Sequence, residues 1–102
     1  MADKILTRED LEEILLAEMD TETGKRADLI VYNDDVNTFD WVIKCFMDIC
    51  NFSFDQSEQL SIIIHYKGKA TIKSGTIPQL KPIKDALVDR GLSAVLKTYK
   101  DV

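Results

Sequence analysis

Cysteine is scarce in this sequence: among 102 residues only Cys45 and Cys50 are present. They lie five positions apart on an expected helix and therefore about 140° apart around its axis, which keeps them from bonding to each other. Neither their spacing nor their neighbours match a zinc-binding or redox motif. We therefore expect two buried thiols that act as small apolar side chains.

Long apolar runs and a surplus of basic residues are missing as well. No apolar run approaches the roughly 20 residues that span a bilayer, and the residues after Met1 lack the apolar core of a secretory signal. The formal net charge of −5 disfavours binding to a phosphate backbone. These absences predict a cytoplasmic protein with one folded domain that binds neither membrane nor nucleic acid.

The sequence also lacks a recognisable catalytic motif. It contains no Gly-x-Ser-x-Gly, no phosphate-binding glycine loop and no His-Glu-x-x-His. A metal site built from Asp34, Asp35 and the single histidine, His65, would have an incomplete and poorly spaced set of ligands. We therefore expect no catalytic residue, no metal and no cofactor.

Acidic residues are concentrated in the first quarter of the chain. Residues 1–26 hold eight acidic and four basic side chains, and Leu11, Ile14 and Leu15 are spaced as on one face of a helix. Two interpretations stay open: a helix that forms transiently or docks, and a passive solvated extension. With either one we expect a flexible, acidic N-terminal extension over residues 1–26 and a core domain over residues 27–102.

The core begins with a strand pattern and a helix pattern that are joined by a short turn. Leu29–Tyr32 is an apolar run rich in β-forming residues and ends at Asn33. Apolar residues then recur at three- and four-residue intervals from Phe39 to Cys50, and Asn37 or Thr38 is available as the N-cap. A helix is therefore predicted directly after the turn.

A second helix is predicted after Ser53. Asp55 and Glu58 have the spacing of a capping box, and Gly68 is suited to end the helix. His65 then lies in the last turn. The apolar stripe of this helix is expected to consist of Leu60, Ile63 and Ile64.

The rest of the chain adds a strand, a helix and a strand. Lys69–Thr76 alternates polar and apolar residues, and a third helix is expected to start near Pro78 or Pro82, to end at Gly91 and to precede a last strand over Leu92–Tyr99. The inward face of that helix would carry Ile83, Leu87 and Val88. This order predicts an α+β domain, a small, mainly antiparallel three-stranded sheet packed against three helices.

The turn after the first strand concentrates polar side chains. Asn33, Asp34, Asp35 and Asn37 lie within five positions, and such residues often do no more than reverse the chain. A second interpretation joins the turn with His65, because carboxylate, amide oxygen and neutral imidazole nitrogen are the acceptors that an ammonium group requires. A histidine at a helix end is also stabilised by the helix dipole, so His65 alone does not decide between the two.

These residues resemble the ClpS family of proteolytic adaptors. The likeness lies in Asn33-Asp34-Asp35, in Val42-Ile43 and in the run His65–Ala70, in the family's order, and it covers Leu29 to Leu96. Members bind the first residue of N-degron substrates, typically Leu, Phe, Tyr or Trp, and pass the substrates to a Clp-type AAA+ unfoldase. The resemblance implies an adaptor and no enzyme, with N-degron peptides, substrate proteins and the unfoldase's N-terminal domain as partners.

The resemblance also implies which residues bind the substrate. Asn33, Asp35 and His65 would hold its α-amino group, with Asp34 shaping the same turn. The pocket for its first side chain would be lined by Asn37, Thr38, Phe39, Val42, Ser61, Ile64 and Ala94.

The predicted pocket departs from the pattern of proteobacterial members. Ser61 and Ala94 replace larger apolar residues, which predicts a wider pocket, whereas Phe39 replaces methionine at the gate, which predicts a narrower mouth. Asn37 and Thr38 stand where those members have Thr-Pro. The sequence therefore does not predict which first residue, Leu, Phe, Tyr or Trp, the pocket prefers.

The sequence also suggests where an unfoldase could dock and offers an alternative function. Lys67, Gln79 and Lys84 mark a candidate surface for its docking. The alternative function is a docking domain that modulates a Clp unfoldase without reading N-termini, because a fold does not determine a function.

Overall fold

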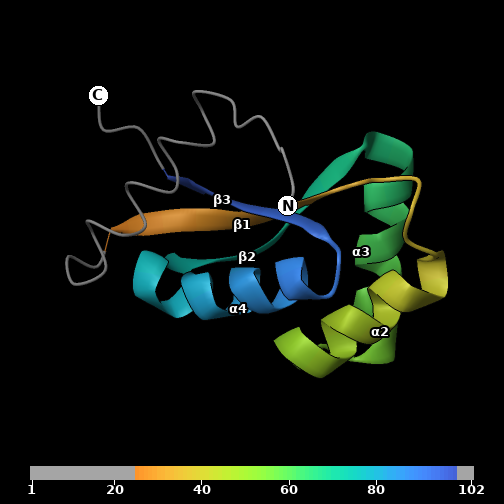
Figure 1. The fold of residues 1–102 in the computed structure, drawn as a ribbon, viewed down its shortest axis with the longest axis horizontal. Coiled ribbons are helices and arrows are strands. Elements are labelled where there is room, and N and C mark those ends of the chain that lie inside the picture. The colour runs from red at the N-terminus through yellow and green to blue at the C-terminus, as the bar shows by residue number, and fades with distance from the viewer. Residues whose placement is uncertain (1–24, 99–102) are drawn as a thin grey trace, which may run out of the picture.

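The computed structural model describes residues 25–98, which form one sheet and three helices (Figure 1). The elements are β1 (Arg26–Tyr32), α2 (Phe39–Cys50), α3 (Phe54–Lys67), β2 (Lys69–Thr76), α4 (Ile77–Asp89) and β3 (Ser93–Thr98). The predicted α+β class and element order are confirmed. The helix predicted around Leu11 and the last predicted strand residue, Tyr99, lie outside the described residues.

β1 is the central strand of the sheet, whose order is β2-β1-β3. It is antiparallel to both neighbours, and its register with β2 shifts between Leu29 and Ile30. Ala27, Leu29 and Val31 alternate along β1 and are buried on the face that the helices cover. The strand begins three residues earlier than the apolar run predicts. Ala27 and Asp28 pair with both β2 and β3, and Arg26 pairs with β2 alone.

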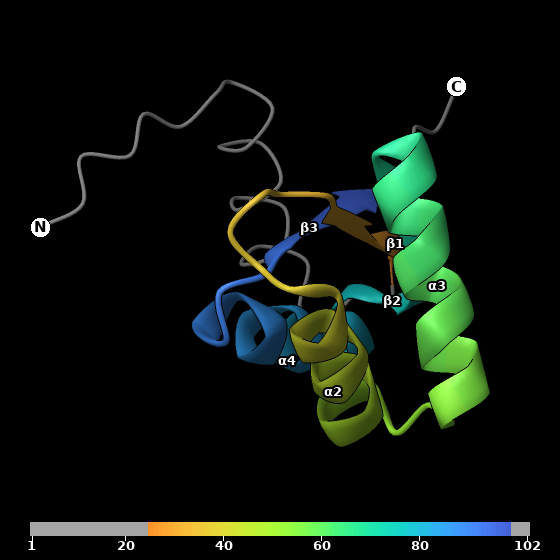
Figure 2. The same cartoon turned by 90° about the vertical axis from the view of Figure 1, so that its right-hand side faces the viewer.

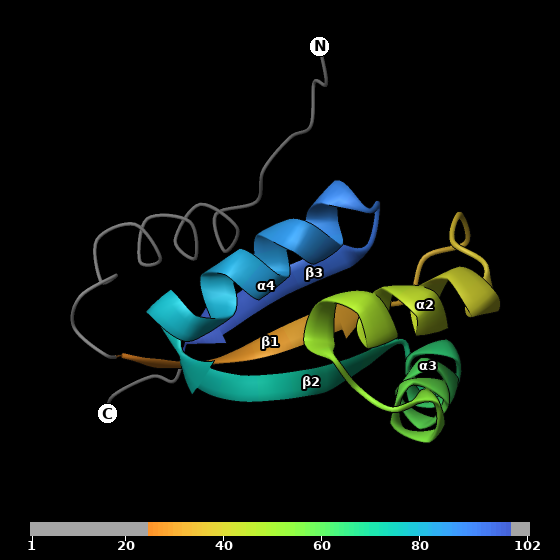
Figure 3. The same cartoon turned by 90° about the horizontal axis from the view of Figure 1, so that it is seen from below.

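The helices are arranged around one side and one end of the sheet. α4 packs against all three strands, whereas α3 packs against β2 and α2. Figure 2 shows α2 between α4 and α3, and Figure 3 shows α4 lying over the sheet and running along β3. The core therefore lies between the sheet and the helices, where Phe46 of α2 and Leu80 and Leu87 of α4 are fully buried.

The turn between β1 and α2 ends at a definite N-cap. The Thr38 Oγ1 atom accepts a hydrogen bond from the Trp41 N–H at 3.1 Å, so Thr38 rather than Asn37 caps α2. At the other end Asn51 adopts a left-handed conformation, with φ of 59°. This residue turns the chain from α2 into α3.

The start of α3 differs from the prediction. Ser53 is the N-cap and accepts a hydrogen bond from the Gln56 N–H at 3.1 Å. The predicted capping box of Asp55 and Glu58 is wrong because the helix starts at Phe54 and Asp55 already lies in its first turn. Gly68 ends α3 as predicted, with φ of 90°.

Two predicted core positions are wrong as well. Ile63 of α3 and Val88 of α4 are 38% and 46% exposed. Each lies one position from a buried residue, Ile64 and Leu87, and one position is about 100° around a helix. α4 starts at Ile77, with Pro78 in its first turn. Of the two predicted starts, near Pro78 or near Pro82, the first is therefore confirmed.

Among the helices of residues 25–98, none has both the length and the apolar character needed to cross a membrane.

Candidate functional site

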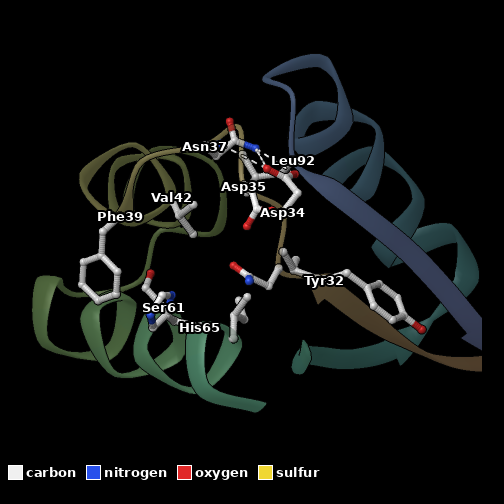
Figure 4. A pocket seen from close by; sticks show the side chains of 12 residues that line it. Tyr32, Asp34, Asp35, Asn37, Phe39, Val42, Ser61, His65 and Leu92 are labelled. Atoms are coloured by element: carbon white, nitrogen blue, oxygen red, sulfur yellow. Dashed lines mark hydrogen bonds between the residues drawn. The ribbon is translucent and has the colours of Figure 1, made fainter. Parts of the chain in front are cut away.

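A cavity of about 280 Å³ lies where the turn after β1 meets α2, α3 and the start of β3 (Figure 4). Nine of the eleven predicted site residues line it. They share the wall with three residues that the sequence did not indicate, Val31, Tyr32 and Leu92. The nine are Asn33, Asp34, Asp35, Asn37, Phe39, Val42, Ser61, Ile64 and His65.

The two other predicted residues lie outside the lining. Thr38 turns its hydroxyl to the N-terminus of α2. Ala94 is 6% exposed within the core and pairs with Val31. Leu92, two positions earlier and 4% exposed, lines the wall instead. The sequence does offer an indication that Leu92 lines the cavity. Leu92 lies two positions before Ala94, and residues i and i+2 of an extended segment share a face.

Asp34 fixes the conformation of the turn. Its Oδ1 atom accepts hydrogen bonds from the N–H groups of Val36 and Asn37, both at 3.0 Å. The Asn37 side-chain amide donates to both carboxylate oxygens, and the Ser93 hydroxyl donates to Oδ2 at 3.1 Å. The Asp34 carboxylate is therefore occupied within the turn and serves to shape it.

These hydrogen bonds change the acidity of Asp34. Partial burial acts to raise the pKa of the carboxyl, but the donors from Asn37, Ser93 and Val36 together lower it from its ordinary value of 3.8. Asp34 consequently carries its negative charge throughout the neutral range.

Further hydrogen bonds attach the turn to distant parts of the chain. The Asn37 amide donates to the Gly91 carbonyl at 2.9 Å, and the Trp41 Nε1–H donates to the Arg90 carbonyl at 3.0 Å. On the opposite side the Asn33 N–H donates to the Gly68 carbonyl at 2.8 Å. The turn is thus held between the end of α4 and the end of α3, which fixes the width of the cavity.

The cavity has a polar rim and a buried floor. Asn33, Asp35 and His65 are exposed, and within residues 25–98 the Asp35 carboxylate makes no hydrogen bond or ion pair. The His65 ring contacts Tyr66 edge-on, at 5.3 Å between centroids. The floor consists of residues at most 4% exposed, namely Val31, Ser61, Ile64 and Leu92.

Aromatic residues flank this arrangement differently. Phe39, 40% exposed, lies at the edge of the cavity, and Val42 lies between it and the acidic turn. The Tyr32 ring points away from the other labelled side chains (Figure 4), and the Lys69 ammonium lies 5.8 Å from its centroid. Phe39, not Tyr32, is therefore placed to contact a bound group.

The arrangement suits a ligand with a charged end and an apolar end. Exposed acceptor groups at the rim match the three donors of an ammonium group. The concave floor beneath them shields an apolar side chain from water. Across residues 25–98, no three histidine, cysteine, aspartate or glutamate residues are grouped as metal ligands.

The two cysteines belong to the core, as the sequence predicts. Cys45 and Cys50 are 0% and 8% exposed, and both are free thiols. Burial raises the pKa of Cys45, and it raises the pKa of Cys50 to about 11. Both side chains are therefore uncharged at neutral pH.

Two proteins of known name are similar to this chain over about two thirds of its length. The chain is 34% identical over 68 residues to the ATP-dependent Clp protease adapter protein ClpS of Streptomyces avermitilis, a match that covers 67% of this chain and 65% of that protein. It is 36% identical over 66 residues to the protein of the same name from Thermosynechococcus vestitus, covering 64% of this chain and 70% of that protein. The chain thus spans just under two thirds of the Streptomyces protein.

A solved structure shares the fold. The structure of Agrobacterium tumefaciens ClpS2 bound to L-phenylalaninamide matches with a TM-score of 0.59, covering 76% of this chain and 99% of that chain, at 18% sequence identity. Residues 22–94 also match the family model described as ATP-dependent Clp protease adaptor protein ClpS. The chain therefore belongs to the ClpS family of Clp protease adaptors.

Proposed function

We propose that this protein is an adaptor that binds the free α-amino group and the large apolar first side chain of N-degron substrates and delivers these substrates to a Clp-type AAA+ unfoldase. The observation that carries the proposal is the position of free acceptors, Asp35 and His65, on the rim directly above a buried floor. The ligand named for the A. tumefaciens protein, L-phenylalaninamide, combines an amino group with an aromatic side chain.

The expected energies are sufficient for a specific complex. Burial of a large apolar side chain contributes about 1.5–3 kcal/mol. Each hydrogen bond between the ammonium group and a charged or polar acceptor contributes up to about 1.5–3 kcal/mol. After the cost of association is subtracted, micromolar binding is expected. An acetylated terminus offers one neutral donor and should bind much more weakly.

The test is a fluorescence-anisotropy titration of labelled peptides that differ only in residue one: Leu, Phe, Tyr, Trp or Ala. Each peptide is used with a free and with an acetylated terminus. We expect binding of the free termini that precede a large apolar side chain. If none of the peptides binds while the protein still binds the N-terminal domain of a Clp unfoldase, it is a docking domain that does not read N-termini.

A charge-matched pair of variants locates the ammonium site. Asp35→Asn removes a rim carboxylate, and we expect it to weaken binding of free-terminus peptides at least about tenfold because it loses a charge-assisted hydrogen bond. Asp55→Asn removes the same charge in the first turn of α3, outside the cavity, and should leave the affinity unchanged. Equal affinities of the two variants would contradict the role of Asp35.

A further inference from the structure

The floor of the cavity carries a hydroxyl group among apolar side chains. Ser61 is 3% exposed and lines the cavity together with Ile64 and Leu92. Its Oγ–H donates to the Ser57 carbonyl at 2.8 Å, so the hydroxyl proton is used within α3. A serine oxygen retains two lone pairs as acceptors. Within residues 25–98 no donor is bonded to this oxygen.

The position of Ser61 relative to the rim is fixed by the helix. His65 follows Ser61 by four residues on α3, so the two side chains share a face and are separated by about 6 Å along the axis. His65 is exposed, whereas Ser61 is buried. Asp35 approaches from the turn on the opposite side of the cavity (Figure 4). When the ammonium group of a substrate's first residue is held at the rim, the side chain of that residue therefore extends into the cavity toward Ser61.

Resting on the proposed function, we propose that Ser61 is a specificity-determining residue that selects tyrosine among large first residues, by accepting a hydrogen bond from the phenol O–H. Ser61 and His65 are separated by about 6 Å along the axis of α3. This separation is close to the length of a tyrosine side chain. Phenylalanine or leucine would cover the same oxygen without offering a donor, and a buried acceptor left unpaired opposes binding.

The experiment compares two peptides that differ by one oxygen atom. Free-terminus peptides that begin with Tyr or Phe are titrated against the wild-type full-length chain and against Ser61→Ala. We expect the wild type to bind the Tyr peptide about tenfold more tightly than the Phe peptide. In Ser61→Ala the ratio should fall to about one, because the acceptor is gone and an apolar methyl group faces the ring.

Ser57→Ala is the matched control. It is the same change in the same helix, one turn away, at a position that is fully buried but does not line the cavity. We expect it to keep the tenfold preference for tyrosine. Should Ser61→Ala fail to fold, Ser61→Cys replaces the hydroxyl by a weak acceptor of similar size and should also reduce the ratio.

The outcomes separate this inference from the proposed function. If the Tyr and Phe peptides bind with the same ratio in the wild type and in Ser61→Ala, Ser61 is not the determinant, although the adaptor reads N-termini. If no free-terminus peptide binds to the wild type, the proposed function fails and the inference fails with it. Loss of the preference in Ser57→Ala as well as in Ser61→Ala would also overturn the role of Ser61.

Discussion

Two adjacent aspartates of the turn, Asp34 and Asp35, have different roles. Asp34 and Asp35 are neighbours with the same side chain, but Asp34 accepts hydrogen bonds from Val36, Asn37 and Ser93, and Asp35 makes none with the described residues. The resemblance had placed Asp34 as the residue that shapes the turn, and its hydrogen bonds agree with that. The adjacent carboxylate remains available for a ligand.

The lowered pKa of Asp34 makes a prediction about acid stability. A carboxyl whose pKa is lower in the folded state contributes stability above its unfolded value, here ordinarily 3.8, and this contribution is lost as the pH falls through the folded value. The free energy of unfolding of the wild type should therefore exceed that of Asp34→Asn at neutral pH. Urea titrations at several pH values should show the difference shrinking below about pH 4. A difference that does not depend on pH would contradict this.

At the scale of elements, the cap of α2 provides a second prediction. Thr38→Ala removes the acceptor for the Trp41 N–H and should lower the free energy of unfolding by about 1 kcal/mol. Because Thr38 does not line the cavity, peptide affinity should change by less than about twofold. Urea unfolding and the anisotropy titration measure the two effects on the same sample. A tenfold loss of affinity with unchanged stability would return Thr38 to the site.

The elements also show what the sequence could predict. β2 was expected over Lys69–Thr76 and has those bounds, and Gly68 ends α3 as expected, because alternation and a left-handed glycine are local signals. Ile63 and Val88 were assigned to the core and are exposed, since an apolar residue at the edge of a helical stripe turns inward only where a neighbouring element covers it.

The candidate site was predictable to a similar degree and for a similar reason. Polar residues of the turn and His65 were indicated by their chemistry and by the family resemblance. Leu92 was missed and Ala94 was included because the place where the last strand passes the cavity depends on tertiary packing. The hydrogen bonds from Asn37 to Gly91 and from Trp41 to Arg90 join residues about 50 positions apart, which no local pattern indicates.

For the molecule as a whole, the two thiols report on global stability. Cys45 and Cys50 are buried in the single core, and burial raises the pKa of both. We expect a thiol reagent at neutral pH to modify the native protein only as fast as the core opens. The labelling rate should follow the global free energy of unfolding when urea is added below the transition. Rapid modification without urea would show that the core opens locally around α2.

The central place of β1 in the sheet has a consequence for synthesis of the protein. Ile30 pairs with Thr71 on one side and with Val95 on the other, so the first strand of the core to leave the ribosome waits for partners about 40 and 65 residues behind it. Until Ser93–Thr98 has emerged, one edge of an apolar strand stays open to other chains. A premature stop a few codons before residue 93 would therefore yield a chain that aggregates, even though most of the cavity-lining residues had been made.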